Sequence, residues 1–435
     1  MLIKRIKNSL LGISGQAVVR EAGLYGLTNL FNQLFLFLSA IVVTRYLGPT
    51  NLGILAFVQN YLLIFLTILA GSDYYYSWNL SRTENADNAT RDYFAYRFKL
   101  SILLSLAGIF IAYFLFPQDI FVYILVVFIP IFLNTFNIFV LYALYEKRAK
   151  LYSSIYFAVS LVGFLLKVLL VYLSASLIYF ILLLGLDIFL TGLAFFYYYG
   201  QNKIFIKNLF DFEFFDLRKD IKYFNLVKYS VLATLCWQLL LRVDQFMLAF
   251  ISQLKFLTPL QNYSGAYNLG IYSAATKIAE MPNAIASIIY ITLIGRLGTL
   301  IKDNNSDTKL RRVFILYVLT GLFLSVSISL LSPLIVNIVY GKDFAESIPV
   351  LQVYSWSIVG VYVIYYYFAL LGAKNKNKKQ SLFFIIGIII NIILIILLTP
   401  IYGLIGTAYA TVISYTLVAL FIYLSEFKNK NHLKE

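Results

Sequence analysis

The sequence predicts an all-α integral membrane protein with about twelve transmembrane helices. Three observations support this fold class: few charged residues, repeated apolar stretches of membrane-spanning length, and a strong bias in the position of the basic residues. Of the 435 residues, 61% are hydrophobic and 13% are charged, whereas soluble domains carry about 25% charged residues. Lipid must therefore contact most of the surface.

A membrane crossing needs about 20 mostly apolar residues. Turn-forming residues separate neighbouring stretches at Gly48-Pro49, at Pro117, and at Pro400 with Gly403. Residues 381–424 contain no charged side chain and exceed one crossing, so the last of these turns divides them into two. The predicted spans are 22–44, 52–72, 98–116, 120–143, 152–173, 177–199, 224–251, 267–295, 313–333, 347–372, 381–399 and 403–424.

The basic residues predict the orientation of these spans. Short cytoplasmic loops carry an excess of Lys and Arg. With the N-terminus inside, 28 of the 35 Lys and Arg fall on the inner side, and only Arg45, Lys255 and Lys342 fall on the outer side. Both termini are therefore predicted to be cytoplasmic. The regular alternation of basic and weakly charged segments also supports the number of spans, because removing one span would exchange the inner and outer segments that follow it.

Composition excludes several other classes of protein. The net charge of +15 is divided among short clusters between apolar runs, so no basic domain exists to bind nucleic acid. The one cysteine, Cys236, allows no internal disulfide. The one histidine, His432, allows neither a Ser-His-Asp triad nor a metal site with several histidines. No GxxxxGK[ST] phosphate-binding loop is present, and no cofactor is expected.

The spans divide into two sets of six. Residues 201–222 carry both charge signs and aromatic side chains, which predicts an amphipathic linker at the cytoplasmic membrane surface. The linker separates an N-terminal six-helix bundle, residues 1–200, from a C-terminal six-helix bundle, residues 223–435. Because six is even, both bundles enter the membrane the same way up, as parallel repeats do.

Two short sequence echoes agree with a repeat. Asn51-Leu52-Gly53-Ile54 opens the second span, and Asn268-Leu269-Gly270-Ile271 opens its counterpart, the eighth. A basic cluster also precedes span five at residues 147–150 and span eleven at residues 374–379.

Four segments resemble a known family. They are TRYLGPTNLG at 44–53, RVDQFML at 242–248, GIYSAATKIAE at 270–280 and VYGKDF at 339–344. The first, third and fourth are similar to the family patterns R-x-LGP-x-x-x-G, G-x-Y-x-A-A-x-K-I-x-E and YG-x-x-F. In these motifs and in its twelve-span layout the chain resembles the polysaccharide flippases, in particular the O-antigen flippases, of the multidrug/oligosaccharide-lipid/polysaccharide exporter superfamily.

The resemblance implies a fold and an activity. The two bundles would surround a central cavity and work by alternating access. The substrate would be an undecaprenyl-diphosphate-linked oligosaccharide, the repeat unit of O-antigen or of another surface polysaccharide. It would move from the cytoplasmic to the periplasmic leaflet of the bacterial inner membrane. Membrane lipids, a polysaccharide polymerase and a chain-length regulator would be the partners, and the protein itself would not be an enzyme.

Ionisable residues inside the spans are the candidate site residues, because each costs about 2.5–3.5 kcal/mol at the centre of a membrane helix. Lys167, Arg242 and Lys277 are the candidates for binding an anionic diphosphate. The candidates for ion coupling are Asp244, Glu280 and Asp187.

Four of the six candidates also have a structural explanation. Lys277 and Glu280 are three residues apart, so they can pair on one helix face. Arg242 and Asp244 point about 200° apart, so one of them can bond a neighbouring helix. No acidic residue lies within one turn of Lys167, which favours a role in the cavity.

The 36 tyrosines include three runs, at 74–76, 197–199 and 365–367. Aromatic belts at the membrane interfaces are the default interpretation of such runs, and stacking on sugar rings is the alternative. Arg45, at the outer end of its span, is expected to extend its charge to water.

Two other functions remain open. A membrane polymerase or glycosyltransferase would need a large outer loop with catalytic groups, and the longest outer segment, 252–266, has Lys255 as its only ionisable side chain. A cation-coupled drug exporter of the same superfamily would share the fold. The basic excess within the spans favours an anionic substrate, but the acidic residues also permit ion coupling.

Overall fold

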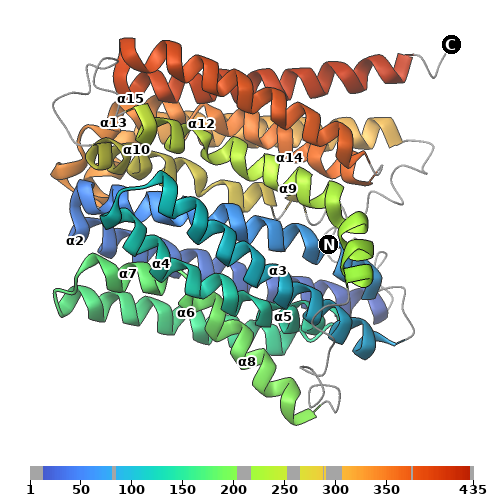
Figure 1. Ribbon diagram of the computed structural model, residues 1–435. Helices are drawn as coiled ribbons and strands as arrows, with labels where there is room; N and C mark the ends of the chain where they lie inside the picture. The colour runs from blue at the N-terminus through green and yellow to red at the C-terminus, as the bar shows by residue number, and fades with distance from the viewer. Residues whose placement is uncertain are drawn as a thin grey trace. The chain divides into compact units, whose positions relative to one another are not determined.

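The computed structural model describes residues 13–80, 85–202, 217–251, 265–287, 289–290, 306–373 and 376–431. Every regular element in these segments is a helix (Figure 1), which confirms the all-α fold class. Most of the predicted linker, 201–222, and of the predicted outer loop, 252–266, lies outside the described residues.

Contacts divide the chain into two compact units. The first unit is Met1–Val43 with Ser72–Val227, and the second is Thr44–Gly71 with Lys228–Glu435. The second predicted span therefore packs with the second unit, although it precedes most of the first unit in sequence. The division into bundles at 1–200 and 223–435 stays a prediction.

The first unit is formed by segments of two long helices and by a series of shorter ones. Both ends of α2 and the beginning of α9 belong to it. Its helices are α2 (Ile13–Leu80), α3 (Ala86–Leu115), α4 (Gln118–Leu133), η1 (Asn134–Asn137), α5 (Ile138–Tyr145), α6 (Ala149–Tyr172), α7 (Leu177–Leu183), α8 (Leu186–Asn202) and α9 (Leu217–Ile251).

The second unit contains the middle of α2, most of α9, and the helices that follow. These are α10 (Gly265–Glu280), α12 (Ser306–Val339), η3 (Lys342–Phe344), α13 (Ser347–Tyr354), α14 (Ser357–Ala373) and α15 (Asn377–Asn431). An apolar core of α9, α12, α14 and α15 side chains holds the unit together, with Leu240, Tyr362 and Val418 fully buried.

The helices agree with a multi-pass membrane protein of about twelve spans. Nine helical stretches in the described part of the chain are long and apolar enough to cross a membrane. Two of them, Leu34–Asp73 and Lys378–Glu426, contain 40 and 49 residues, enough for two crossings each. Gly48 (φ 68°) and Gly403 (φ 62°) turn the chain inside α2 and α15, as the Gly-Pro signals predicted, because only glycine adopts these angles without strain.

Several spans are interrupted in ways that the sequence analysis did not predict. Span four changes to the 3₁₀ turn η1, and span eight turns at Met281-Pro282. Backbone groups freed inside a membrane need local partners, and η1 is surrounded by polar side chains. Ser101 and Thr135 share a 2.9 Å hydrogen bond between their hydroxyls, and Arg97 donates to the side-chain oxygen of Asn134.

Arg97 is a buried cation of the first unit. It lies within α3 with 1% of its side chain exposed, paired with Asp73. The Tyr93 hydroxyl also donates to Asp73, at 2.9 Å. Arg97 therefore belongs to a buried polar cluster between the last part of α2 and the first half of α3, and its place on the inner side stays a prediction.

The first sequence echo becomes a helix crossing within the second unit. A Cβ at Gly53 would meet the Ala266 carbonyl and the Gly270 nitrogen, and a Cβ at Gly270 would meet the Pro49 carbonyl and the Gly53 nitrogen. Ala266 lies four residues before Gly270, and Pro49 lies four residues before Gly53. Each glycine therefore packs on the carbonyl one helical turn before the other glycine. This reciprocity is what a local two-fold relation produces, and small residues at such crossings allow backbones to approach closely.

Gly270→Ala should separate α2 from α10, because the added methyl overlaps backbone that cannot move independently. Overpacking of this kind costs about 1–3 kcal/mol, so the thermal unfolding temperature of the purified protein should fall. Gly372→Ala is the matched control, since nothing lies within 4 Å of a Cβ at that position of α14. Equal unfolding temperatures for the two variants would contradict the close crossing.

Candidate functional site

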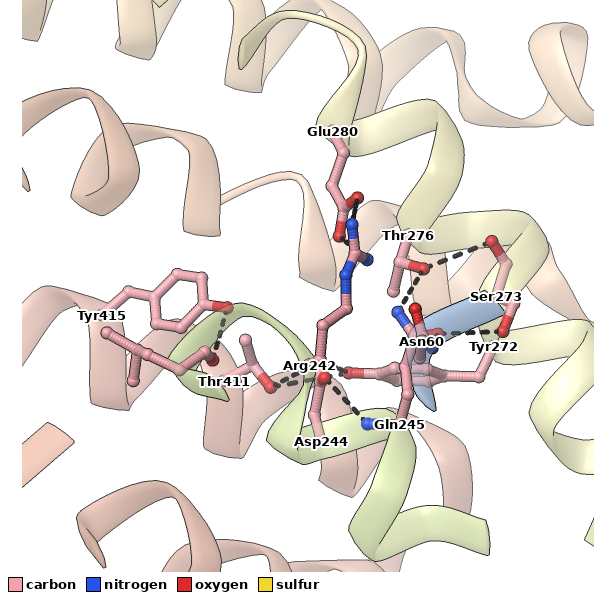
Figure 2. A network of polar contacts seen from close by, with 11 residues as sticks. Asn60, Arg242, Asp244, Gln245, Tyr272, Ser273, Thr276, Glu280, Thr411 and Tyr415 are labelled. Atoms are coloured by element: carbon pink, nitrogen blue, oxygen red, sulfur yellow. Dashed lines mark hydrogen bonds and ion pairs between the residues drawn. The ribbon is translucent and has the colours of Figure 1, made fainter. Parts of the chain in front are cut away.

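Three polar residues of α9 form the centre of the candidate site. Arg242, Asp244 and Gln245 lie in an otherwise apolar part of this helix, and each bonds to a residue from a different element of the second unit. Their buried polar groups need partners, because an unpaired group in a low-dielectric interior is costly. Figure 2 shows the side chains of α9 meeting those of α10 and α15.

Arg242 forms a two-pronged ion pair with Glu280 of α10. The two guanidinium nitrogens lie 2.7 and 2.8 Å from the two carboxylate oxygens, and the side chains are 17% and 18% exposed. This is the two-point geometry in which a guanidinium binds a carboxylate most strongly, although Nε of Arg242 is buried without a hydrogen bond to a described residue. The sequence analysis offered a pair between Lys277 and Glu280 as the structural explanation of both residues. That prediction is wrong, because both carboxylate oxygens of Glu280 bond Arg242 instead.

Asp244 is fully buried and accepts three hydrogen bonds. The Tyr272 hydroxyl donates at 2.7 Å, the Thr411 hydroxyl at 3.2 Å and the Gln245 backbone N–H at 2.8 Å. The side-chain oxygen of Asn391 is buried nearby without a hydrogen bond to any described residue, while its nitrogen lies 3.5 Å from the Thr411 hydroxyl. Helices α9, α10 and α15 thus place several oxygens around one carboxylate.

Gln245 extends this network to α2. Its side-chain oxygen accepts from Asn60 at 2.6 Å and from Ser273 at 3.3 Å, and its side-chain nitrogen donates to Thr276 at 3.3 Å (Figure 2). The amide therefore couples three helices of the second unit. All of these groups are buried, so the network also fixes the register of α2 against α9 and α10.

Lys277 follows Thr276 on α10, and its side chain is half-buried. Unlike Arg242, it makes no hydrogen bond or ion pair within the described part of the chain. Its ammonium group is close enough to Arg242 and Glu280 to feel both charges. Lys277 is therefore a cation in a polar part of the second unit whose hydrogen-bonding capacity is not used.

Lys167 and Asp187 lie in the other unit. Lys167 is half-buried on α6 and takes part in an interaction with its surroundings, while Asp187 lies in the first turn of α8, which packs on α6. The substrate-binding role predicted for Lys167 and the coupling role predicted for Asp187 stay predictions. Within the second unit the structure brings together Arg242, Asp244, Lys277 and Glu280 on the neighbouring helices α9 and α10.

Aromatic side chains of α9, of α14 and of the segment after α10 gather in the same unit. Trp237 of α9 lies 5.6 Å from Tyr365, Tyr290 lies 5.5 Å from Phe368, and Tyr365 lies 6.1 Å from Tyr290, measured between ring centroids. Trp237, Tyr290 and Tyr365 are partly buried. The default interpretation of the 365–367 run as an interface belt fails for Tyr366 and Tyr367, which are buried in the core of the unit.

Comparison with known proteins identifies the family. The family described as polysaccharide biosynthesis protein matches residues 18–298, about two thirds of the chain. The chain belongs to this family. The resemblance expected from the four motifs is thereby confirmed. No curated protein matches the sequence.

Solved structures show that this polysaccharide biosynthesis protein has the fold of transporters of the MOP superfamily. An inward-facing multidrug resistance MATE transporter is 14% identical over 94% of this chain and 99% of its own, with a TM-score of 0.68. A MOP transporter from Pyrococcus furiosus is 15% identical over 96% of each chain, with a TM-score of 0.68. A MATE transporter from Vibrio cholerae is 11% identical over 96% of this chain and 98% of its own, with a TM-score of 0.64.

Two of the motifs that suggested this family meet in the structure. Arg45 donates from Nε to the Val339 carbonyl at 3.0 Å and from a terminal nitrogen to the Ile338 carbonyl. These are the last carbonyls of α12, where a cation satisfies unpaired acceptors and opposes the helix dipole. The expectation that Arg45 only extends to water is therefore incomplete, because its guanidinium caps a helix.

Several site residues were not singled out from the sequence. Tyr272, Thr411 and Asn391 carry no charge and stand among many similar residues, so only the contacts of Tyr272 and Thr411 with Asp244, and of Asn391 with Thr411, reveal them. Tyr272 lies inside a quoted motif, which was the available signal. No group of three or more His, Cys, Asp or Glu residues suited to a metal ion occurs in the described segments.

Proposed function

We propose that the protein moves an undecaprenyl-diphosphate-linked oligosaccharide, the repeat unit of O-antigen or of another surface polysaccharide, from the cytoplasmic to the periplasmic leaflet by alternating access. The observation that carries the proposal is the half-buried Lys277, whose ammonium is not bonded within the described chain, in a member of the polysaccharide biosynthesis family. The protein would act in the bacterial inner membrane with both termini in the cytoplasm, beside a polysaccharide polymerase and a chain-length regulator.

The diphosphate would bind at Lys277. An ammonium that has given up part of its hydration gains by contact with phosphate oxygens, and the charge of Arg242 raises the local positive potential. Arg242 itself is engaged with Glu280, so its contribution is mainly electrostatic. Lys167, in the first unit, stays a separate candidate for contact with the substrate.

The sugar would pack on the aromatic side chains of the same unit. Trp237, Tyr290 and Tyr365 are partly buried and present ring faces and polar tips. Such side chains offer large apolar area together with a hydrogen-bonding group. A neutral or acidic sugar could contact them while the diphosphate stays at Lys277.

Asp244 would couple transport to a cation gradient. It is a buried carboxylate that accepts from the hydroxyls of Tyr272 and Thr411, and Asn391, next to Thr411, has a buried side-chain oxygen without a hydrogen bond to a described residue. Oxygen donors of this kind suit a hard cation, and the carboxylate alone suits a proton. Glu280 is the weaker candidate because its two oxygens bond Arg242, and Asp187 remains a second candidate in the first unit.

A drug exporter is the second candidate function. The fold is shared with multidrug MATE transporters, and a buried carboxylate serves coupling in either case. At Lys277 a cationic drug would be repelled and an anionic diphosphate attracted, because the ammonium makes no ion pair within the described segments, whereas Arg242 is paired with Glu280. Binding of a polyprenyl diphosphate in preference to cationic dyes by the purified protein would therefore favour the flippase.

Lys277→Ala should reduce flipping of a fluorescent polyprenyl-diphosphate sugar in liposomes at least tenfold and abolish surface polysaccharide in cells. The reason is the loss of the ammonium that would meet the diphosphate. Lys342→Ala, an exposed cation in η3, is the control and should flip normally. Normal flipping by Lys277→Ala, with unchanged protein level in the membrane, would refute the proposed binding site.

A further inference from the structure

An apolar groove lies on the surface of the first unit between α6 and α8. Its volume is about 780 Å³, within the range of small-molecule sites. The groove is lined by Ala158 and Val162 of α6 and by Leu193, Ala194, Tyr197 and Gln201 of α8, among others. Small side chains in the middle of both helices leave room for it, and five of these six residues are exposed: Ala158, Val162, Leu193, Tyr197 and Gln201.

The lining of the groove indicates what it faces. Both helices are long and apolar enough to span a membrane. A surface turned to water would carry polar groups along its length, but here the polar atoms are confined to the end of α8, at Tyr197 and Gln201. The groove therefore faces lipid, and a hydrocarbon chain must fill it, because an empty space would forfeit dispersion contacts on both sides.

A basic turn lies at the polar end of the groove. Lys147, Arg148 and Lys150 stand between α5 and α6, with Glu146 as the one acid beside them. Arg148 donates to the Tyr198 hydroxyl at 2.7 Å and to Glu146 at 2.7 Å, which attaches the turn to the end of α8. The hydrogen bond to Glu146 holds the pKa of Arg148 above its usual value, so the arginine stays charged.

The two lysines of this turn have their charges available. Lys147 and Lys150 are exposed, and neither side chain is bonded to another described residue. Lys150 lies in the first turn of α6, about two turns before Ala158, and Arg148 next to it bonds Tyr198 beside the groove residue Tyr197. The free positive charge thus lies beyond the end of the hydrocarbon lining at which α6 begins and α8 ends.

We propose that this groove is a binding site for an anionic phospholipid, with one acyl chain between α6 and α8 and the phosphate at Lys147 and Lys150. Basic pockets between membrane helices bind such head groups. The site would hold a lipid of the cytoplasmic leaflet, since the basic turn lies on the predicted inner side. It is separate from Lys277 and Asp244, which belong to the other unit.

Native mass spectrometry of the purified protein, titrated with phosphatidylglycerol or with phosphatidylcholine of the same chains, tests this site. We expect one phosphatidylglycerol to be retained per chain and phosphatidylcholine to be lost. The double variant Lys147→Gln/Lys150→Gln should retain phosphatidylglycerol about tenfold more weakly. Ala158→Trp, which fills the groove, should do the same. Lys342→Gln and Leu330→Trp, on an exposed turn and an exposed face of α12, are matched controls and should retain it normally.

Three results would overturn the proposal. Equal retention of phosphatidylcholine would show that charge plays no part. Loss in the lysine variant but not in Ala158→Trp would indicate surface charge without a groove. Displacement of phosphatidylglycerol by an equal concentration of polyprenyl diphosphate would assign the groove to the substrate tail. Because the measurement is retention of a phospholipid, it is independent of whether the protein flips a lipid-linked sugar.

Discussion

Asp244→Asn is expected to abolish the response of flipping to an imposed cation gradient. The substitution keeps the size of the side chain but removes the negative charge that a sodium ion or a proton would neutralise. In liposomes, a tenfold gradient of one monovalent cation can support about tenfold accumulation of product, which corresponds to about 1.4 kcal/mol. The variant should show equal amounts in both leaflets with the gradient and without it.

The experiment also identifies the cation. Separate sodium and proton gradients are applied to the wild-type protein, and the one that drives accumulation is then applied to the variants. Tyr272→Phe removes one donor to the carboxylate and should weaken the response without abolishing it. Asp343→Asn changes an exposed acid in η3 and serves as the control. An undiminished response in Asp244→Asn would exclude this residue as the coupling site.

The fold was predictable from the sequence because its signals are local. A run of apolar residues directly indicates a membrane span. A glycine beside or near a proline indicates a turn, as the positive φ angles of Gly48 and Gly403 confirm. The interruption at η1 was not predictable in this way, because Asn134 and Thr135 interrupt an apolar run only briefly. The break is stabilised by Arg97 and Ser101 of another helix, which no local pattern can show.

The candidate site was predictable only in part, for the same reason. Asp244, Glu280 and Arg242 could be singled out because each is a costly charge in an apolar span. Their partners could not, since Asp244 bonds Tyr272 and Thr411, 28 and 167 residues away. The choice between Lys277 and Arg242 as the partner of Glu280 also depended on packing. Helix spacing favoured the lysine, but the arginine of α9 reaches both carboxylate oxygens.

Glu280→Gln is expected to destabilise the protein strongly. It leaves the Arg242 guanidinium, 17% exposed, without its counter-charge, and breaking a buried pair on one side costs about 3–5 kcal/mol. Thermal unfolding of the purified protein in detergent should show a large fall in the midpoint temperature. Glu346→Gln, an exposed acid before α13, should leave the midpoint unchanged.

The double variant Arg242→Met/Glu280→Leu separates stability from function. Apolar replacement of both partners removes the desolvation penalty together with the attraction, so the midpoint should recover most of its loss. If the midpoint temperature stays as low as in Glu280→Gln, Arg242 and Glu280 do not form an isolated pair, and other buried groups need them for stability. Flipping by the recovered protein then measures what the ion pair as a whole contributes to the diphosphate site, because the double variant removes one positive and one negative charge together. We expect a partial loss that is smaller than the loss in Lys277→Ala, because Arg242 is already paired with Glu280, whereas Lys277 makes no hydrogen bond or ion pair within the described segments.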